Sequence, residues 1–250
     1  MLDHGVDINR TDHGRTEDGF RLASPSDTSL KILNSVGARC DIELYDHLIA
    51  RGADQSRSLA LHCATRCKDA EKSTAMIDHL LDKYHMDIEF DNEELRNNFD
   101  TAGDSGTPLS SAVYYQNLPA IHKLLARGAQ PEPAAMDAIG HINFHEGYLP
   151  ALCPLLDAGA DLADAFHWAV GWGNVEAARI CIERGADPTD AAEKERLRAL
   201  RKAAAMEAGE TEHRAEHQAS AGERLPRGKL TREMQEFLKT IRNGGSLFAK

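Results

Sequence analysis

Several features that would place the chain in a common class are scarce or missing. Aromatic residues make up 6% of the 250 residues, and no apolar run approaches the length of about 18 residues that suggests a membrane-spanning helix. The N-terminal stretch is acidic and polar and contains no apolar segment of the kind that a secretory signal needs. These absences exclude a membrane span and a secretory signal. We therefore expect an intracellular protein, cytoplasmic or nuclear.

Cysteine is also sparse, with five residues in the whole chain. An odd number of cysteines without a secretory signal indicates reduced thiols rather than a disulfide framework. Cys63 and Cys67 are four residues apart, but a metal site would need about two more suitable ligands nearby. We interpret the cysteines as small buried apolar residues and expect no metal.

The net charge of −11 makes generic nucleic-acid binding unfavourable, because phosphate would be repelled. The sequence has no glycine-rich phosphate loop and no Gly-x-Ser-x-Gly nucleophile motif. Nothing in it points to a catalytic pair of carboxylates. We therefore expect neither an enzyme nor a bound cofactor.

One phrase recurs along the chain: an apolar pair, a short polar linker, and then Gly-Ala-Asp or a variant of it. An apolar pair closes an amphipathic helix, glycine ends the helix in the left-handed conformation, and Asp or Asn bonds to the backbone of the following turn. Alanine fits where the chain passes close to its neighbour. The third copy has Tyr84-His85 in place of glycine. The six copies begin at Leu2, Leu48, Leu80, Leu124, Leu155 and Cys181.

A second short helix with small internal residues precedes the later phrases, as in the segments from Ser58, Gly106 and Ala165. Helix, tight turn, helix and Gly-Ala-Asp in repetition resemble the ankyrin repeat, most closely at Gly106-Thr107-Pro108-Leu109 and around Phe166 to Glu176. The resemblance implies an all-α solenoid of stacked antiparallel helix pairs over residues 1–189, with a partial first repeat and about five further repeats. The first copy lacks a partner helix, so we expect a fragment of a longer protein or a truncated gene.

The apolar positions of these helix pairs predict the core. The residues expected there are Leu30, Leu33, Leu44, Leu48, Leu61, Ala64, Ile77, Leu80, Leu109, Ala112, Ile121, Leu124, Leu152, Leu155, Phe166, Ala169, Ala178 and Cys181.

Residues 190–250 form a second region, a charged helical tail with 13 Lys plus Arg against 10 Asp plus Glu. Strong helix formers predict a helix over residues 190–208, which we expect to dock on the last repeat through Leu197 and Leu200. A second helix is predicted over residues 231–241, with Thr231 as N-cap and Met234, Phe237, Leu238 and Ile241 on one face. The tail either caps the array or binds another protein.

The resemblance implies a concave face, built from inner helices and fingers, that binds a partner protein. Counting back from each closing phrase places Ser35 and Val36 on this face. It also places there the candidate binding residues Arg66, Tyr114, Tyr115, His145, Glu146 and Trp172. Tyr, Trp and Arg are the residues most often found as binding hot spots. The alternative for the aromatic residues is a partly buried contact between repeats.

Residues 1–189 carry 16 Lys plus Arg against 30 Asp plus Glu, so we expect the partner protein to present a basic patch. The oligomeric state is not indicated. The resemblance gives His62 and His167 a structural role, tying the turn of one repeat to the next. The alternative function is an enzyme or regulatory subunit with a histidine-containing pocket, for which His141, His145 and Cys153 are the candidates.

Overall fold

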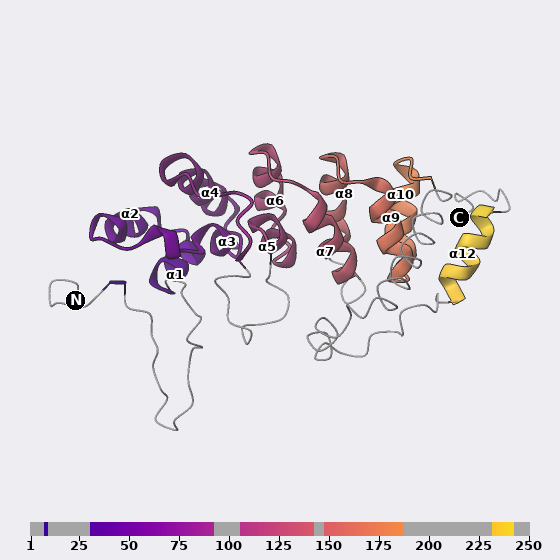
Figure 1. Ribbon diagram of the computed structural model, residues 1–250, viewed down its shortest axis with the longest axis horizontal. Coiled ribbons are helices and arrows are strands. Elements are labelled where there is room, and N and C mark those ends of the chain that lie inside the picture. The colour runs from indigo at the N-terminus through magenta and orange to yellow at the C-terminus, as the bar shows by residue number, and fades with distance from the viewer. Residues whose placement is uncertain (1–7, 10–30, 93–105, 143–147, 188–231, 243–250) are drawn as a thin grey trace, which may run out of the picture. The chain divides into compact units, whose positions relative to one another are not determined.

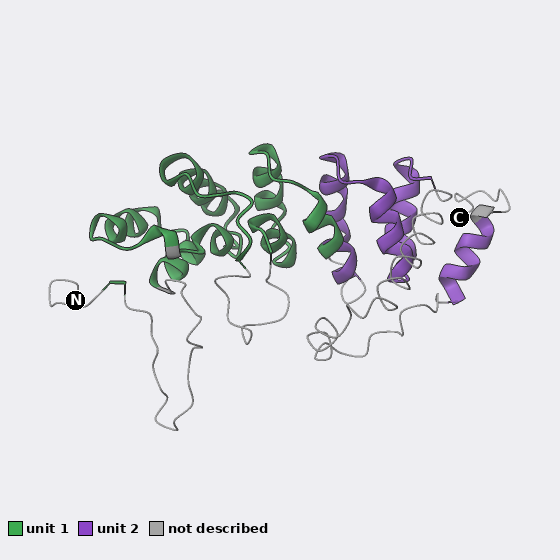
Figure 2. Ribbon diagram, viewed as in Figure 1, with its two compact units in different colours: residues 1–137 green, residues 138–250 purple. Residues whose placement is uncertain are grey.

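The computed structural model describes residues 8–9, 31–92, 106–142, 148–187 and 232–242. Within these ranges the chain is helical and contains no β-strand, in agreement with the predicted all-α fold. None of the described helices is long and apolar enough to cross a membrane. Contacts between residues divide the chain into two compact units, residues 1–137 and residues 138–250 (Figure 2).

Helix pairs build the first unit (Figure 1). The inner helices α1 and α3 pack on each other, as do α3 and α5, and among the outer helices α4 packs on α6. The bounds are α1 Lys31–Arg39, α2 Ile42–Ala50, α3 Ala60–Ala64, α4 Ala70–Tyr84, α5 Pro108–Tyr114 and α6 Leu118–Ala126, with a 3-10 turn at Gln55–Arg57. The helix α7, Glu132–Ile142, contains the boundary between the units.

A left-handed residue followed by a capping residue joins an inner helix to its outer helix. In the first unit Cys40 and Gln116 have φ values of 53° and 54°, and the next residue, Asp41 or Asn117, caps the outer helix with its side chain. In the second unit the left-handed residue is Gly173, and it is again followed by an N-cap residue, Asn174. The turn thus ends one helix and starts the next within two or three residues.

The recurring phrase forms the end of each outer helix, as predicted. At Gly128, for example, φ is 95°, its N–H donates to Leu125, and the N–H of Ala129 donates to Leu124. These two bonds are the Schellman arrangement that satisfies the last carbonyls of a helix. The same pair of bonds closes the helices at Gly52, Gly159 and Gly185, and each following alanine is buried. At the third copy His85 itself is left-handed, with φ of 51°.

The predicted core is confirmed at all but two positions. Leu30 lies outside the described residues, and the prediction for Leu44 is wrong, because 40% of this side chain is exposed. The buried stripe of α2 instead runs through Tyr45 and Leu48. The Tyr45 ring is fully buried and meets the ring of Tyr84 edge-on at 5.3 Å between centroids. The side chain of Tyr45 therefore occupies the buried position that we had expected Leu44 to fill.

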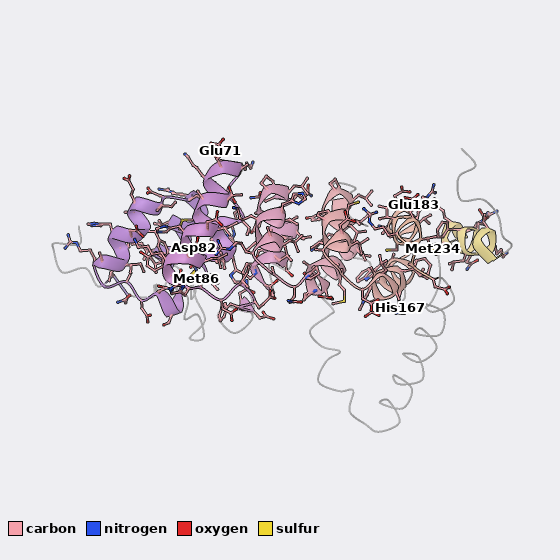
Figure 3. All side chains as sticks on the ribbon, turned by 90° about the horizontal axis from the view of Figure 1, so that it is seen from above. Glu71, Asp82, Met86, His167, Glu183 and Met234 are labelled. Atoms are coloured by element: carbon pink, nitrogen blue, oxygen red, sulfur yellow. The ribbon has the colours of Figure 1, made fainter. Side chains whose placement is uncertain are left out.

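Ion pairs connect neighbouring outer helices within each unit. In the first, Lys123 donates to Asp78 at 2.7 Å, and Arg127 on the C-terminal side of α6 bonds both Asp78 and Asp82 of α4 (Figure 3). In the second, Arg184 donates to Asp157 of the preceding outer helix at 3.0 Å. Arg127 and Arg184 both precede the glycine of their phrase, and Asp82 and Asp157 both follow its apolar pair. Asp78, Asp82 and Asp157 are thus each paired with a basic side chain of the following outer helix.

The second unit contains α8 Leu149–Asp157, α9 Leu162–Gly171, α10 Val175–Glu183 and α12 Arg232–Arg242, the last of which packs on α10 (Figures 1 and 3). The predicted second tail helix is therefore confirmed, with Met234 and Phe237 buried and Leu238 half-buried. Its proposed N-cap Thr231 and the first tail helix over residues 190–208, with Leu197 and Leu200, lie outside the described residues.

Candidate functional site

Two tyrosines close the inner helix α5. Thr107 caps this helix, accepting a hydrogen bond from Ser110, and Pro108 occupies the first helical turn, where its missing N–H costs nothing. Tyr114 is the last residue of α5 and Tyr115 its C-cap. The left-handed Gln116 then turns the chain sharply, which leaves both rings half-buried at the end of the helix.

The structure brings three of the six predicted binding residues together. The guanidinium carbon of Arg66, in the turn after α3, lies 5.1 Å from the centroid of the Tyr115 ring. Tyr115 and Tyr114 meet edge to face, with 5.1 Å between centroids and 89° between planes. The Arg66 side chain is exposed, so its cation–π contact with Tyr115 presents charge and aromatic surface side by side. We call Arg66, Tyr114 and Tyr115 the tyrosine–arginine cluster.

Asn117 fixes the backbone on both sides of Arg66. Its side-chain amide donates to the carbonyl oxygens of Thr65 at 2.8 Å and Cys67 at 3.0 Å, and contacts the hydroxyl of Ser73 at 3.1 Å. Its carbonyl oxygen meanwhile caps α6. One residue therefore ties the turn that carries Arg66 to the turn that carries the tyrosines, and so holds the tyrosine–arginine cluster in place.

Trp172 occupies the corresponding position in the second unit. It is the half-buried C-cap of α9 and is followed by Gly173 and the capping Asn174, just as Tyr115 is followed by Gln116 and Asn117. In the first turn the corresponding position is held by Arg39, which we did not predict from the sequence. Arg39 precedes the left-handed Cys40 and is exposed.

We had expected Val36, with Ser35, on the concave face. Val36 is instead buried. Counting back from the closing phrase misplaced the turn. The capping Asp or Asn, which lies two residues after Tyr115 and Trp172, is the better marker in the sequence, and the same spacing leads to Arg39.

The histidine-pocket residues are only partly described. His145 and Glu146 lie outside the described residues. The ring of His141 stacks on the ring of Tyr148 at 5.0 Å, while Cys153 interacts electrostatically with Arg184. The described ranges contain no group of three or more His, Cys, Asp or Glu residues arranged to hold a metal ion. The described part of the chain thus gives His141 and Cys153 separate neighbours.

His62 shows how one repeat is tied to the next. Its side chain is buried, and its Nε2 lies 3.0 Å from the carbonyl oxygen of Gly106, at the turn that opens the next repeat. The predicted structural role is therefore confirmed for His62. His167, at the same motif position, is also buried, and its ring lies against that of Trp168.

Part of the chain matches a known protein family. Residues 161–193, which begin at the cap of α9, match the family model of the ankyrin repeat. Among solved structures, the human ASB11 ankyrin repeat domain is similar over 66% of this chain and 71% of its own length, with 17% identity and a TM-score of 0.43. No curated protein matches the chain.

The family match covers one helix pair of the second unit. The described helix pairs of both units end in left-handed turns, and a buried alanine follows wherever the left-handed residue is glycine. Repetition of a helix–turn–helix unit with this closing phrase is the defining pattern of the family. Residues 161–193 therefore match the ankyrin repeat, and the other described helix pairs are similar to it in their helix–turn–helix arrangement.

Proposed function

We propose that the chain binds a partner protein, and that the tyrosine–arginine cluster of the first unit is a principal contact. Ankyrin-repeat domains are generally protein-binding modules. The observation that carries the proposal is the exposed guanidinium of Arg66 held over the ring of Tyr115, with the backbone on both sides fixed by Asn117. Rigid tyrosine and arginine side chains supply contact area at a small cost in conformational entropy.

Trp172 extends the proposal to the second unit, because it is the C-cap of its inner helix, as Tyr115 is of α5. His145 and Glu146 remain part of the proposed contact surface on the sequence argument alone. The whole set is Arg66, Tyr114, Tyr115, His145, Glu146 and Trp172.

The charge of the repeat region favours a partner with a basic patch. Residues 1–189 carry 30 Asp plus Glu against 16 Lys plus Arg. A field of this sign accelerates the encounter with a basic surface, and salt screens it. We therefore expect the association rate to fall as ionic strength rises, while the dissociation rate, set by the aromatic contacts, changes much less.

The experiment is a comparative capture with the full chain as bait. The parent, Tyr115→Ala and Lys68→Ala are each exposed to the same cell extract, and the recovered proteins are quantified by mass spectrometry. Lys68 is the matched control, since it is an exposed residue in the same turn as Arg66. A true partner is depleted by Tyr115→Ala and retained by Lys68→Ala.

Purified partner then gives the magnitude. Loss of a buried aromatic anchor typically costs about 2 kcal/mol, which corresponds to roughly 30-fold weaker binding for Tyr115→Ala or Trp172→Ala. Melting curves of the same variants separate binding from folding, because both rings are half-buried. Variants that melt early and bind normally once folded would assign the rings to packing between repeats and overturn the proposal.

A further inference from the structure

Two exposed arginines lie on consecutive turns of the first unit. Arg39 is the last residue of α1, and Arg66 lies in the turn that follows α3. The thiol of Cys40, next to Arg39, donates to the carbonyl oxygen of Ala64, two residues before Arg66, at 3.7 Å. The two turns are therefore neighbours in space, and each carries one exposed cation.

The tyrosines belong to the next turn of the same series. Asn117, in the turn after α5, donates to the backbone oxygens on either side of Arg66, and the guanidinium of Arg66 lies 5.1 Å from the centre of the Tyr115 ring. The third turn is therefore in contact with the second. In chain order, the three turns present an arginine, an arginine and a pair of tyrosines.

The carboxylates of the first two turns are engaged by the backbone. Asp41 accepts a hydrogen bond from the N–H of Leu44 at 3.0 Å, and Asp69 from the N–H of Lys72 at 3.1 Å. The positive end of the helix dipole offsets part of the charge of such a cap. Arg39 forms no ion pair among the described residues, whereas several cations of the outer helices are paired with aspartates.

Arg66 can bind a carboxylate without leaving Tyr115. A guanidinium group is planar and carries five N–H donors in its plane, so that its face can rest on an aromatic ring while its edge donates to an anion. The contact with the ring also fixes the side chain, which reduces the entropy lost when a carboxylate binds.

The packing of the inner helices sets the spacing between the turns. A Cβ atom on Gly37 would lie 2.8 Å from the Cα atom of Ala60, so α1 and α3 approach each other closely. The axes of packed helices are about 8–10 Å apart, and an extended chain advances about 3.3 Å per residue. About three residues of an extended segment therefore span the distance from one turn to the next.

We propose that the first unit recognises an extended acidic segment of the partner protein. Two carboxylates three residues apart pair with Arg39 and Arg66, and an aromatic residue three positions further contacts Tyr114 and Tyr115. The inference rests on the proposed function, because it takes the tyrosine–arginine cluster as the contact. It gives this segment the opposite charge to the basic patch, which is left to meet the acidic remainder of the repeats.

The test measures the binding of fluorescein-labelled synthetic peptides to the full chain by fluorescence anisotropy. The acidic probe has two glutamates three residues apart and a phenylalanine three residues beyond the second, with serine elsewhere. A second acidic probe has the reverse order, so that both chain directions are covered. Matched probes carry glutamine or lysine in place of both glutamates. We expect one acidic probe to bind, its glutamine counterpart to bind about 5-fold more weakly, as the loss of two exposed ion pairs implies, and its lysine counterpart to bind most weakly.

Variants of the chain assign the pairs. Arg39→Ala should weaken the acidic probe roughly 3-fold and leave the glutamine probe unchanged. Arg39→Glu should bind better to a probe with lysine at the glutamate farther from the phenylalanine than to the acidic probe. Lys68→Ala, which removes an exposed cation from the same turn as Arg66, is the control and should behave as the parent does. Tyr115→Ala should weaken every probe, and melting curves verify that each variant is folded.

The outcomes separate this inference from the proposed function. Tighter binding of the lysine probe would show that the net charge of the chain governs the contact, and would overturn the acidic segment while leaving the role of the tyrosine–arginine cluster standing. Equal binding of the glutamate and glutamine probes, no binding of either acidic probe, or equal losses in Lys68→Ala and Arg39→Ala would overturn it as well. Retention of the captured partner by Tyr115→Ala would contradict the proposed function itself.

Discussion

Asp46 on the outer helix α2 is the acceptor for three side chains of α4. Lys83 donates to it at 2.7 Å and Tyr84 at 2.6 Å, while the Nε2 of His79 lies 2.7 Å away. Burial by itself would raise the pKa of Asp46, but the hydrogen bonds from Lys83, Tyr84 and His79 outweigh it and lower the pKa from 3.8 to about 2. The same contact raises the pKa of Tyr84, after desolvation as the larger cause.

We expect Asp46→Asn to lower the free energy of unfolding by about 1 kcal/mol at neutral pH, because the pair with Lys83 is half-exposed. The folded-state pKa is depressed, so the contribution is fully present above pH 3.8 and is lost as the pH falls through about 2. Urea unfolding of parent and variant at pH 7, 5, 3 and 2 should therefore show a difference that shrinks in the last two steps.

Glu43→Gln is the control, because Glu43 is an exposed carboxylate on the same helix. It should change the unfolding free energy little at any of these pH values. A difference between Asp46→Asn and parent that persists undiminished at pH 2 would show that the charge of Asp46 is not the source.

At this scale the sequence predicts the backbone conformation of the closing turns and most of the buried positions. The described glycines of the recurring phrase are left-handed as expected, and His85 shows that the conformation persists at the copy without glycine. Leu44 was misassigned because apolarity alone does not say which of two adjacent residues faces the neighbouring helix. Tyr45 occupies the buried position because it contacts Ser58 and Tyr84, which belong to later segments of the chain.

The element that carries the proposed binding residues is the turn between inner and outer helix. Asn117 belongs to the third such turn but donates to backbone oxygens of the second, at Thr65 and Cys67. Its capping role is readable from the sequence, since Asn commonly precedes a helix. Its bonds to the second turn are not readable, because they depend on how successive repeats stack.

We expect Asn117→Ala to cost about 2–3 kcal/mol, since it removes the cap of α6 and leaves carbonyl groups of the preceding turn without their donor. Asn117→Asp separates the two roles. The carboxylate still caps α6, and Asp41 holds the same position naturally, but it repels the oxygens of Thr65 and Cys67. Thermal melts should place Asn117→Asp well below the parent; a melt equal to that of the parent would leave capping as the whole effect.

Part of the candidate site was predictable from the repeat pattern and the residue types. The repeat frame brought Arg66, Tyr114 and Tyr115 to inner-helix ends, and tyrosine beside arginine is a recognisable hot-spot composition. The stacking of Arg66 on Tyr115 joins two repeats and follows from a turn length that periodicity does not specify. Arg39 was missed because the glycine phrase is a less reliable reference point than the capping residue.

At the scale of the whole molecule, an array of repeats needs a cover at each end. In the second unit α12 supplies one, packing on α10 with Met234 and Phe237 buried. The sequence predicted this helix from its apolar stripe, since Met234, Phe237 and Leu238 recur at helical spacing. The sequence analysis assigned the docking contact to Leu197 and Leu200, which lie outside the described residues.

We expect Met234→Ala to lower the free energy of unfolding of the second unit by about 2 kcal/mol, because it empties a fully buried position. Glu233→Ala, at the exposed neighbouring position, should stay within about 0.5 kcal/mol of the parent. Denaturant titrations of the full chain measure both. Equal unfolding curves for the two variants would mean that α12 does not cover the unit.

The ion pairs between outer helices make the repeats of this chain non-interchangeable. Asp82 is matched by Arg127, and Asp157 by Arg184, whereas Ala126 holds the acidic position of the fourth phrase and Ala158 the basic position of the fifth. The acidic residue of one copy thus pairs with the basic residue of the next outer helix. Duplicating the copy that contains Asp157 would set this carboxylate opposite Ala158 instead of Arg184, so the order of the repeats is itself encoded in the chain.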